Sequence, residues 1–240
     1  MPRPKDLLRL NLGCGLQVAD EWVNVDGSWN ARLARYPALR RLLSSLHIIA
    51  RDKSEIPWDS KIFIHDIRKP LPFPDDSVSA VYASHVLEHL YVEEGRSLIR
   101  ESFRVLASSG ILRVVVPDLN AIVREYLGER PFGQLSDDLA SLNPADRLNQ
   151  RLLMRWPTPG KNGLLYRIYS SWQDFHSHKW MYDTDSLVAL FQTEGFVEVQ
   201  SKDCHNSRID DIGKVENPSR ILNGGGICVE GVKPPSQPVA

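Results

Sequence analysis

Residues 10–15 read Leu-Asn-Leu-Gly-Cys-Gly, an apolar run that ends in a Gly-x-Gly turn. The run begins at Leu7 and has the length and apolar character of a strand that is buried on both faces. Glycine lets the backbone turn sharply and lets a ligand approach without meeting a Cβ atom. Because open α/β sheets bind ligands at the carboxyl ends of their strands, this turn predicts a ligand site directly after the first strand.

An acidic residue ends the next expected strand, which runs from Trp22 to Val25 and is followed by Asp26. A carboxylate there can accept hydrogen bonds from both hydroxyls of a ribose, each contributing about 1.5 to 3 kcal/mol. A Gly-x-Gly-x-x-Gly dinucleotide motif is incomplete, because position 18 is Val18 and the chain from Gly15 to Trp22 is too short for a crossover helix. The pattern favours a nucleoside cofactor without a pyrophosphate; an ordinary tight turn with a strand-end aspartate is the alternative.

Strands and helices alternate along most of the remaining chain. Further apolar runs of strand length lie at 62–64, 80–86, 111–116, 196–199 and 227–232. Amphipathic helices are expected over 93–106 and 119–127, and another that starts at Asp183 or Thr184 and ends at Gly195. This order predicts an α/β fold with a Rossmann-like, mostly parallel sheet and helices on both faces.

Two stretches, 28–60 and 130–180, interrupt this alternation and hold many of the basic residues. We interpret them as insertions within a single domain over residues 1–232, the second being a substrate lid, and residues 233–240 as a disordered Pro-rich tail. If the substrate is anionic, its counter-charges are expected there. The basic residues concerned are Arg32, Arg35, Arg40, Arg41, Arg147, Arg151, Arg155 and Arg167.

Composition and charge exclude several classes of function. The 240 residues carry 29 Lys and Arg against 30 Asp and Glu, a formal net charge of −1, which argues against nucleic acid as the main partner. No run approaches the roughly 20 apolar residues that span a bilayer, and the N-terminus shows no signal peptide. Three cysteines are too few, and odd in number, for a disulfide framework. We therefore expect a cytoplasmic globular protein.

Several motifs in order resemble class I S-adenosylmethionine-dependent methyltransferases of the methyltransferase type 11 group. They are LNLGCG at 10–15, NVD at 24–26, HDI at 65–67, LPFPDDS at 71–77, VYASHVLEHL at 81–90 and RESFRVLASSGILRVVVP at 100–117. The resemblance covers residues 1–117 and, more loosely, 179–200. It implies an antiparallel last strand, S-adenosylmethionine as the cofactor, and methyl transfer to a small-molecule or saccharide-type acceptor.

The resemblance also implies which residues bind the cofactor. The glycine turn would pass beneath its amino-acid and ribose portions, Asp26 would hold the ribose hydroxyls, and Asp66 with Ile67 would flank the adenine. The mouth of the fourth strand would contribute a serine. The cofactor-binding residues expected on this basis are Gly13, Cys14, Gly15, Asp26, Asp66, Ile67 and Ser84.

Histidines are the expected catalytic residues. A general base is needed if the acceptor is a hydroxyl or a protonated amine, and His85 or His176 would supply it because imidazole titrates near neutral pH. Residues 85–89 also match the H-x-x-E-H zinc signature, and His176 with His178 and His85 could hold a metal. The signature requires a helix, whereas this one begins at the end of a strand, so we expect no metal site.

Other classes of function stay open on the sequence alone. The first is a non-catalytic protein that binds S-adenosylmethionine or a nucleoside. The second is an NAD-dependent sugar-modifying enzyme. The third is a zinc hydrolase that uses His85, Glu88 and His89.

Overall fold

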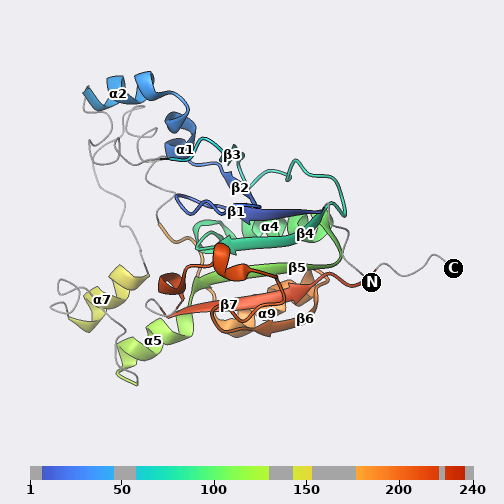
Figure 1. The fold of residues 1–240 in the computed structure, drawn as a ribbon. Helices are drawn as coiled ribbons and strands as arrows, with labels where there is room; N and C mark the ends of the chain where they lie inside the picture. Colours follow the sequence, from blue (N-terminus) through green and yellow to red (C-terminus); the bar gives the residue numbers. More distant parts are fainter. Residues whose placement is uncertain (1–6, 46–57, 130–142, 153–176, 222–224, 236–240) are drawn as a thin grey trace.

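The computed structural model describes residues 7–45, 58–129, 143–152, 177–221 and 225–235. They contain a seven-stranded sheet with the strand order β3-β2-β1-β4-β5-β7-β6 (Figure 1). β7 pairs antiparallel with β5 and β6, and the other pairs are parallel, which confirms the predicted α/β fold and its antiparallel last strand. The strands are β1 Leu8–Leu12, β2 Val23–Asp26, β3 Phe63–Ile64, β4 Val78–Ser84, β5 Leu106–Pro117, β6 Val197–Ser201 and β7 Gly226–Val232.

The helices begin and end where their capping residues predict. Asp183 accepts a hydrogen bond from the backbone N–H of Ser186 at the start of α9, and α5 ends at Gly128, whose φ is 75°. None of the described helices is both long and apolar enough to cross a membrane. The helices are α1 Trp29–Ala34, α2 Pro37–Ser45, α4 Val92–Val105, α5 Leu119–Leu127, α7 Pro144–Arg151, α9 Thr184–Thr193 and the 3-10 helices η1 Leu87–His89, η3 Ile212–Lys214 and η4 Pro218–Arg220.

Different elements cover the two faces of the sheet. One face packs against α4 and α9, with Ile99 and Phe191 fully buried between helix and sheet. The other face packs against the connection between β6 and β7, through Ile209, Ile212 and Val215. In the described part of the chain, the connection on this second face contains the short 3-10 helices η3 and η4.

Two buried asparagines shape the short link between β1 and β2. Residues 13–22 form no helix, as their number predicted. The amide nitrogen of Asn11 donates to Oδ1 of Asn24 (2.9 Å) and to the carbonyl of Gln17 (2.8 Å). Asn24 in turn accepts from the N–H of Ala19 (3.0 Å) and donates to the carbonyls of Ala19 (2.9 Å) and Trp22 (3.0 Å). Side-chain hydrogen bonds thus fix the shape of this link, which is too short to contain a crossover helix.

A buried arginine fastens the β6–β7 connection to the sheet. Arg113 in β5 is fully buried and donates to both carboxylate oxygens of Glu216, each at 2.8 Å. It also pairs with Glu230 of β7 at 3.2 Å and donates to the carbonyls of Asp203 and Asn206, each at 3.0 Å. Because each of these groups is taken out of water, the network holds the connection only while all of its members are present.

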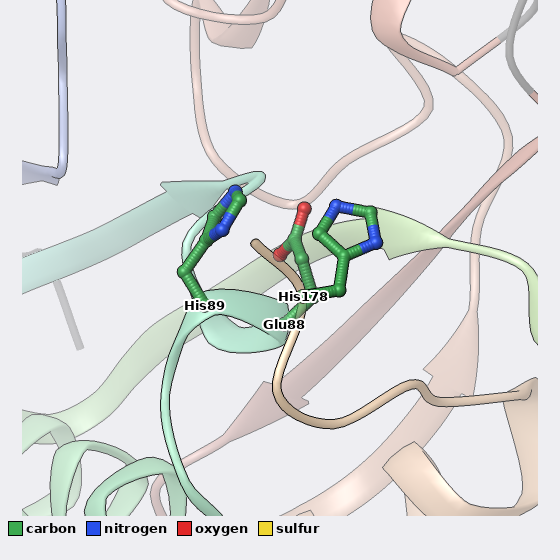
Figure 2. Close-up of side chains that lie close together, drawn as sticks. All are labelled: Glu88, His89 and His178. Atoms are coloured by element: carbon green, nitrogen blue, oxygen red, sulfur yellow. The ribbon is translucent and has the colours of Figure 1, made fainter. Parts of the chain in front are cut away.

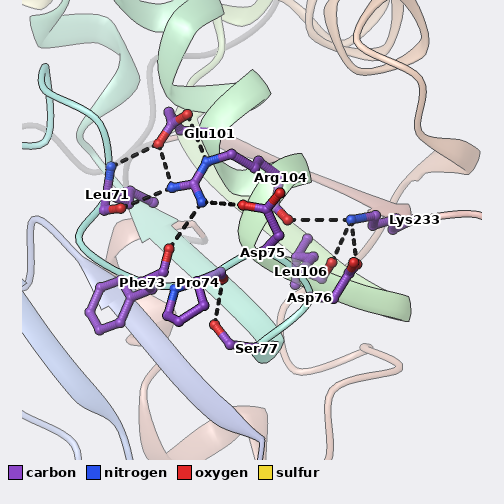
Figure 3. A network of polar contacts seen from close by, with 10 residues as sticks. All are labelled: Leu71, Phe73, Pro74, Asp75, Asp76, Ser77, Glu101, Arg104, Leu106 and Lys233. Atoms are coloured by element: carbon purple, nitrogen blue, oxygen red, sulfur yellow. Dashed lines mark hydrogen bonds and ion pairs between the residues drawn. The ribbon is translucent and has the colours of Figure 1, made fainter.

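The LPFPDDS segment, residues 71–77, lies at the amino end of β4 and has a structural role (Figure 3). The guanidinium of Arg104 in α4 makes five hydrogen bonds, two to the carboxylate of Glu101 and one each to the carbonyls of Leu71 and Phe73 and to Asp75. The hydrogen bonds from Arg104 to Glu101 also lower the pKa of the Glu101 carboxyl. The segment therefore links α4 to the start of β4, at the opposite end of that strand from the glycine turn.

Lys233, expected at the start of the tail, is tied to the sheet. Its backbone N–H donates to the carbonyl of Gly110 (2.9 Å), and its carbonyl accepts from Ser109 (3.0 Å). Its ammonium group donates to Asp76 (2.8 Å) and to the carbonyl of Leu106 (2.7 Å) (Figure 3). The anchored chain therefore extends at least to Lys233.

Replacing the buried guanidinium should be costly. Arg113→Met, which keeps an unbranched side chain but removes the guanidinium group, should lower the free energy of unfolding by about 3 to 5 kcal/mol, because Glu216 and Glu230 would stay buried without their partner. Adding Glu216→Gln should recover part of that loss by removing one of the stranded charges. Urea denaturation measures both effects, and a loss below about 1 kcal/mol for Arg113→Met would contradict the role given to the network.

The asparagine pair can be tested in the same way. Asn24→Ala should lower the free energy of unfolding by about 2 to 4 kcal/mol, because several buried backbone groups of the β1–β2 link lose their partner. Asn120→Ala, at an exposed position in α5, is the control and should change it by less than about 0.5 kcal/mol. Equal effects of the two substitutions would show that Asn24 does not hold the link.

Candidate functional site

The glycine turn after β1 has the open backbone that the sequence predicted. Gly13 and Gly15 have φ values of 63° and 55°, in the region that favours glycine. A Cβ atom at Gly13 would lie 2.3 Å from Cγ2 of Val86, so no larger residue fits there. A Cβ atom at Gly15 would meet no atom within 4 Å, so the space beside this residue is open to a ligand.

The carboxylate of Asp26 is fixed against this turn. The backbone N–H of Gly15 donates to Oδ2 at 2.9 Å, and that of Ser28 donates to Oδ1 at 2.8 Å. Asp26 is only 7% exposed, so these bonds hold it in one place. Since a carboxylate offers about four acceptor positions, each oxygen can still accept from a ligand hydroxyl.

Cys14 lies between the two glycines and is buried. Its backbone N–H donates to the carbonyl of Val25 at 3.1 Å, which ties the turn to β2. Burial, followed by the charge of Asp26, raises the pKa of the thiol to about 12, so Cys14 stays a neutral thiol at physiological pH. All three cysteines are free, and the role of Cys14 in this turn is one of shape and contact.

Asp66 and Ile67 follow β3, beside the end of β2. The carboxylate of Asp66 accepts two hydrogen bonds from the guanidinium of Arg68, at 2.9 and 2.8 Å, and the pair lowers the pKa of Asp66. Ile67 is partly buried against the main core. A ligand at Asp66 therefore meets a carboxylate whose charge Arg68 already balances.

Arg220 of η4 holds the end of β4. Its guanidinium donates to the carbonyl of Ser84 at 3.0 Å, and its own carbonyl lies 3.1 Å from Nε2 of His85. The other ring nitrogen of His85 lies 3.0 Å from a carboxylate oxygen of Glu88. Both ring nitrogens thus face protein oxygens, and His85 can accept a proton from a substrate only after one of these contacts opens.

The second predicted catalytic histidine, His176, lies outside the described residues. The H-x-x-E-H segment runs from the end of β4 into the 3-10 helix η1, so His85 and His89 do not share the α-helical face that the zinc signature requires. Sequence reasoning missed one grouping in this region, which joins Glu88 and His89 to His178 from far along the chain. In the sequence, the signal for it is Glu88, the one acidic residue of the segment 81–90.

The comparisons with known proteins agree with this geometry. Residues 10–114 match the family model of the Methyltransf_11 family, described as a methyltransferase domain. No curated protein sequence matches the chain at a significant level.

Many solved structures show a distant likeness to this chain. A chain from the complex between the Haloferax volcanii Trm112 methyltransferase activator and a protein described as a methyltransferase has a TM-score of 0.47 and 14% identity, over 98% of this chain and 85% of that one. A methyltransferase from Archaeoglobus fulgidus has a TM-score of 0.45 and 15% identity, over 95% and 87%. A protein from Thermotoga maritima, described as a possible histamine N-methyltransferase, has 0.41 and 16%, over 94% and 81%.

The family match covers the strands that form the site. Residues 10–114 run from β1 into β5 and include the glycine turn, Asp26, Asp66 and the end of β4. This part of the chain therefore resembles a methyltransferase domain of the Methyltransf_11 family, and the strand order with the antiparallel β7 is the α/β fold that the sequence predicted.

Proposed function

We propose that this methyltransferase binds S-adenosylmethionine at the carboxyl ends of β1, β2 and β3 and methylates a small-molecule or saccharide-type acceptor. The observation that carries the proposal is the carboxylate of Asp26, which two backbone N–H groups hold against the open turn at Gly15. A buried acceptor beside an exposed stretch of glycine backbone suits the paired hydroxyls of a ribose.

S-adenosylmethionine fits the chemistry of these residues. It offers two ribose hydroxyls as donors, and it has no pyrophosphate, which would need the helix N-terminus that residues 13–22 lack. In this proposal the turn from Gly13 to Gly15 passes beneath the ribose and amino-acid portions, Asp66 and Ile67 flank the adenine, and Ser84 lines the site. When bound, the cofactor supplies a methyl group that its sulfonium charge already activates.

The residues of the chain then position the acceptor and exclude water from the site. His85 lies at the mouth of β4, where Glu88 and Arg220 fix its ring. We assign it the role of general base for a hydroxyl or protonated amine, with the proton passing to Nδ1 once its contact with Glu88 opens. His176 in the proposed lid is the second candidate for this role.

The acceptor is proposed to be anionic because basic side chains follow the site. α1 begins three residues after Asp26, and Arg32, Arg35 and Arg41 are exposed in the first insertion. In the second insertion, α7 packs against α5 through the ion pair of Arg151 with Glu125 (3.2 Å). Exposed guanidinium groups next to a ligand site attract carboxylate or phosphate groups.

Asp26→Ala tests the cofactor site. The substitution should weaken binding of S-adenosylmethionine and S-adenosylhomocysteine at least tenfold in titration calorimetry, because it removes the acceptor for the ribose hydroxyls. Asp20→Ala, in the exposed part of the same link, should leave both affinities unchanged. Thermal unfolding checks that the variant is folded, since Asp26 also binds Gly15 and Ser28. An unchanged affinity, or binding of NAD but of neither sulfur ligand, would refute the assignment.

The charge of the acceptor can be tested by a screen. Hydroxylated and aminated small molecules, each as an anionic and a neutral pair, are incubated with the enzyme and S-adenosylmethionine, and a gain of one CH₂ is sought by mass spectrometry. We expect transfer to anionic members, with a KM that rises several-fold in the double variant Arg32→Gln, Arg35→Gln. Transfer that prefers the neutral members, or a KM that the double variant leaves unchanged, would contradict the proposal.

A further inference from the structure

Three side chains with metal-binding atoms meet just beyond the end of β4. Glu88 and His89 belong to η1, and His178 comes from a segment about ninety positions further along the chain. One ligand atom from each of them lies within 4.8 Å of the other two. Figure 2 shows the carboxylate of Glu88 between the two imidazole rings, whose centroids are 5.0 Å apart.

The carboxylate of Glu88 lacks the partners that a buried charge requires. The side chain is 0% exposed, and within the described residues neither of its oxygens has a hydrogen bond. Nδ1 of His85 lies 3.0 Å from Oε1, but without the alignment of a hydrogen bond. A buried carboxylate without donors is costly, and a bound cation removes that cost.

His85 is the nearest nitrogen donor to Glu88, but it does not form a hydrogen bond with the carboxylate. Its Nε2 faces the carbonyl oxygen of Arg220 at 3.1 Å, and its Nδ1 lies 3.0 Å from Oε1 of Glu88 without the alignment of a hydrogen bond. A cation bound by Glu88 would supply the partner that the carboxylate lacks.

The two histidines present suitable nitrogen atoms. Nδ1 of His89 lies 3.2 Å from the carbonyl of Ser177, so it donates to that oxygen and leaves the lone pair on Nε2. Metal-binding histidines commonly hold their second nitrogen in this way. Nδ1 of His178 is buried and has no hydrogen-bond partner in the described part of the chain.

Backbone hydrogen bonds preset the distances between these residues. The carbonyl of Glu88 accepts from the N–H groups of Lys179 (2.8 Å) and Trp180 (3.3 Å), which joins η1 to the segment that carries His178. The N–H of His89 donates to the carbonyl of Val86 at 3.0 Å. The ligand atoms are therefore held together before any ion binds, so less ordering entropy is lost on binding.

A second cluster shows that proximity alone does not make such a site. Cys204, His205 and Glu216 meet the same distance limit. The carboxylate of Glu216, however, accepts hydrogen bonds from Arg113 at 2.8 Å on both oxygens and from the N–H of His205 at 2.6 Å. Its charge is already balanced, whereas that of Glu88 is not.

We propose that Glu88, His89 and His178 form a binding site for a divalent transition-metal ion of the zinc type. Two imidazoles and one carboxylate are a ligand set that binds Zn²⁺ and leaves a coordination position open. Magnesium prefers oxygen ligands, so the affinity should fall from Zn²⁺ through Mn²⁺ to Mg²⁺. The site differs from the H-x-x-E-H signature because His178 takes the place of His85, and it replaces the sequence expectation of no metal.

Metal titration of the full chain, free of any tag and treated with chelator, tests the proposal. Calorimetry with Zn²⁺ should give one site per chain, Co²⁺ should give the visible absorption of a bound ion, and Zn²⁺ should raise the Tm. Glu88→Gln and His178→Ala should each weaken Zn²⁺ binding at least tenfold and abolish the rise in Tm. These measurements need neither cofactor nor acceptor, so their outcome is independent of the proposed function.

His205→Asn is the matched control, because it removes an imidazole from the other cluster and asparagine tolerates the positive φ of 61° at this position. It should leave Zn²⁺ affinity unchanged. If circular dichroism shows that Glu88→Gln does not fold, His89→Ala and His178→Ala are used to test the site instead. Three results would overturn the proposal: no one-to-one site in the wild type, binding that survives every ligand substitution, or loss of binding in His205→Asn.

Discussion

Arg113 in β5 joins Glu216 of the β6–β7 connection and Glu230 of β7 beneath a sheet face that no described α-helix covers. The same connection carries Arg220, which binds the carbonyl of Ser84 and the ring of His85 at the end of β4. The packing of that face therefore determines where Arg220, and with it the ring of His85, is held. If the ion network loosened, the residue that fixes His85 would lose its support.

The short link between β1 and β2 explains why this fastening is needed. Ten residues leave no room for a crossover helix, so Asn11 and Asn24 shape the link and the β6–β7 connection covers part of the face. The same shortness determines which ligand fits. Without a helix N-terminus to receive a pyrophosphate, the turn at Gly15 and the carboxylate of Asp26 suit a single nucleoside.

Local patterns predicted most of the fold, because strand runs, capping residues and the glycine turn are signals within a few residues of sequence. The ion network could not be predicted this way: Arg113 is a charged residue in an apolar run, and its partners lie 103 and 117 positions away. The grouping of Glu88 with His178 was missed for the same reason, since only the folded chain joins them. The contact between Asp26 and Gly15 follows from local sequence, because adjacent parallel strands bring their carboxyl ends together.

The central claim is that the carboxylate of Asp26 receives the ribose of S-adenosylmethionine beside the glycine turn. A crystal structure of the protein with S-adenosylhomocysteine tests it most directly. The account predicts both ribose hydroxyls within hydrogen-bonding distance of Asp26, with the adenine beside Asp66 and Ile67. A ligand bound elsewhere, or a ribose that turns away from Asp26, would contradict it.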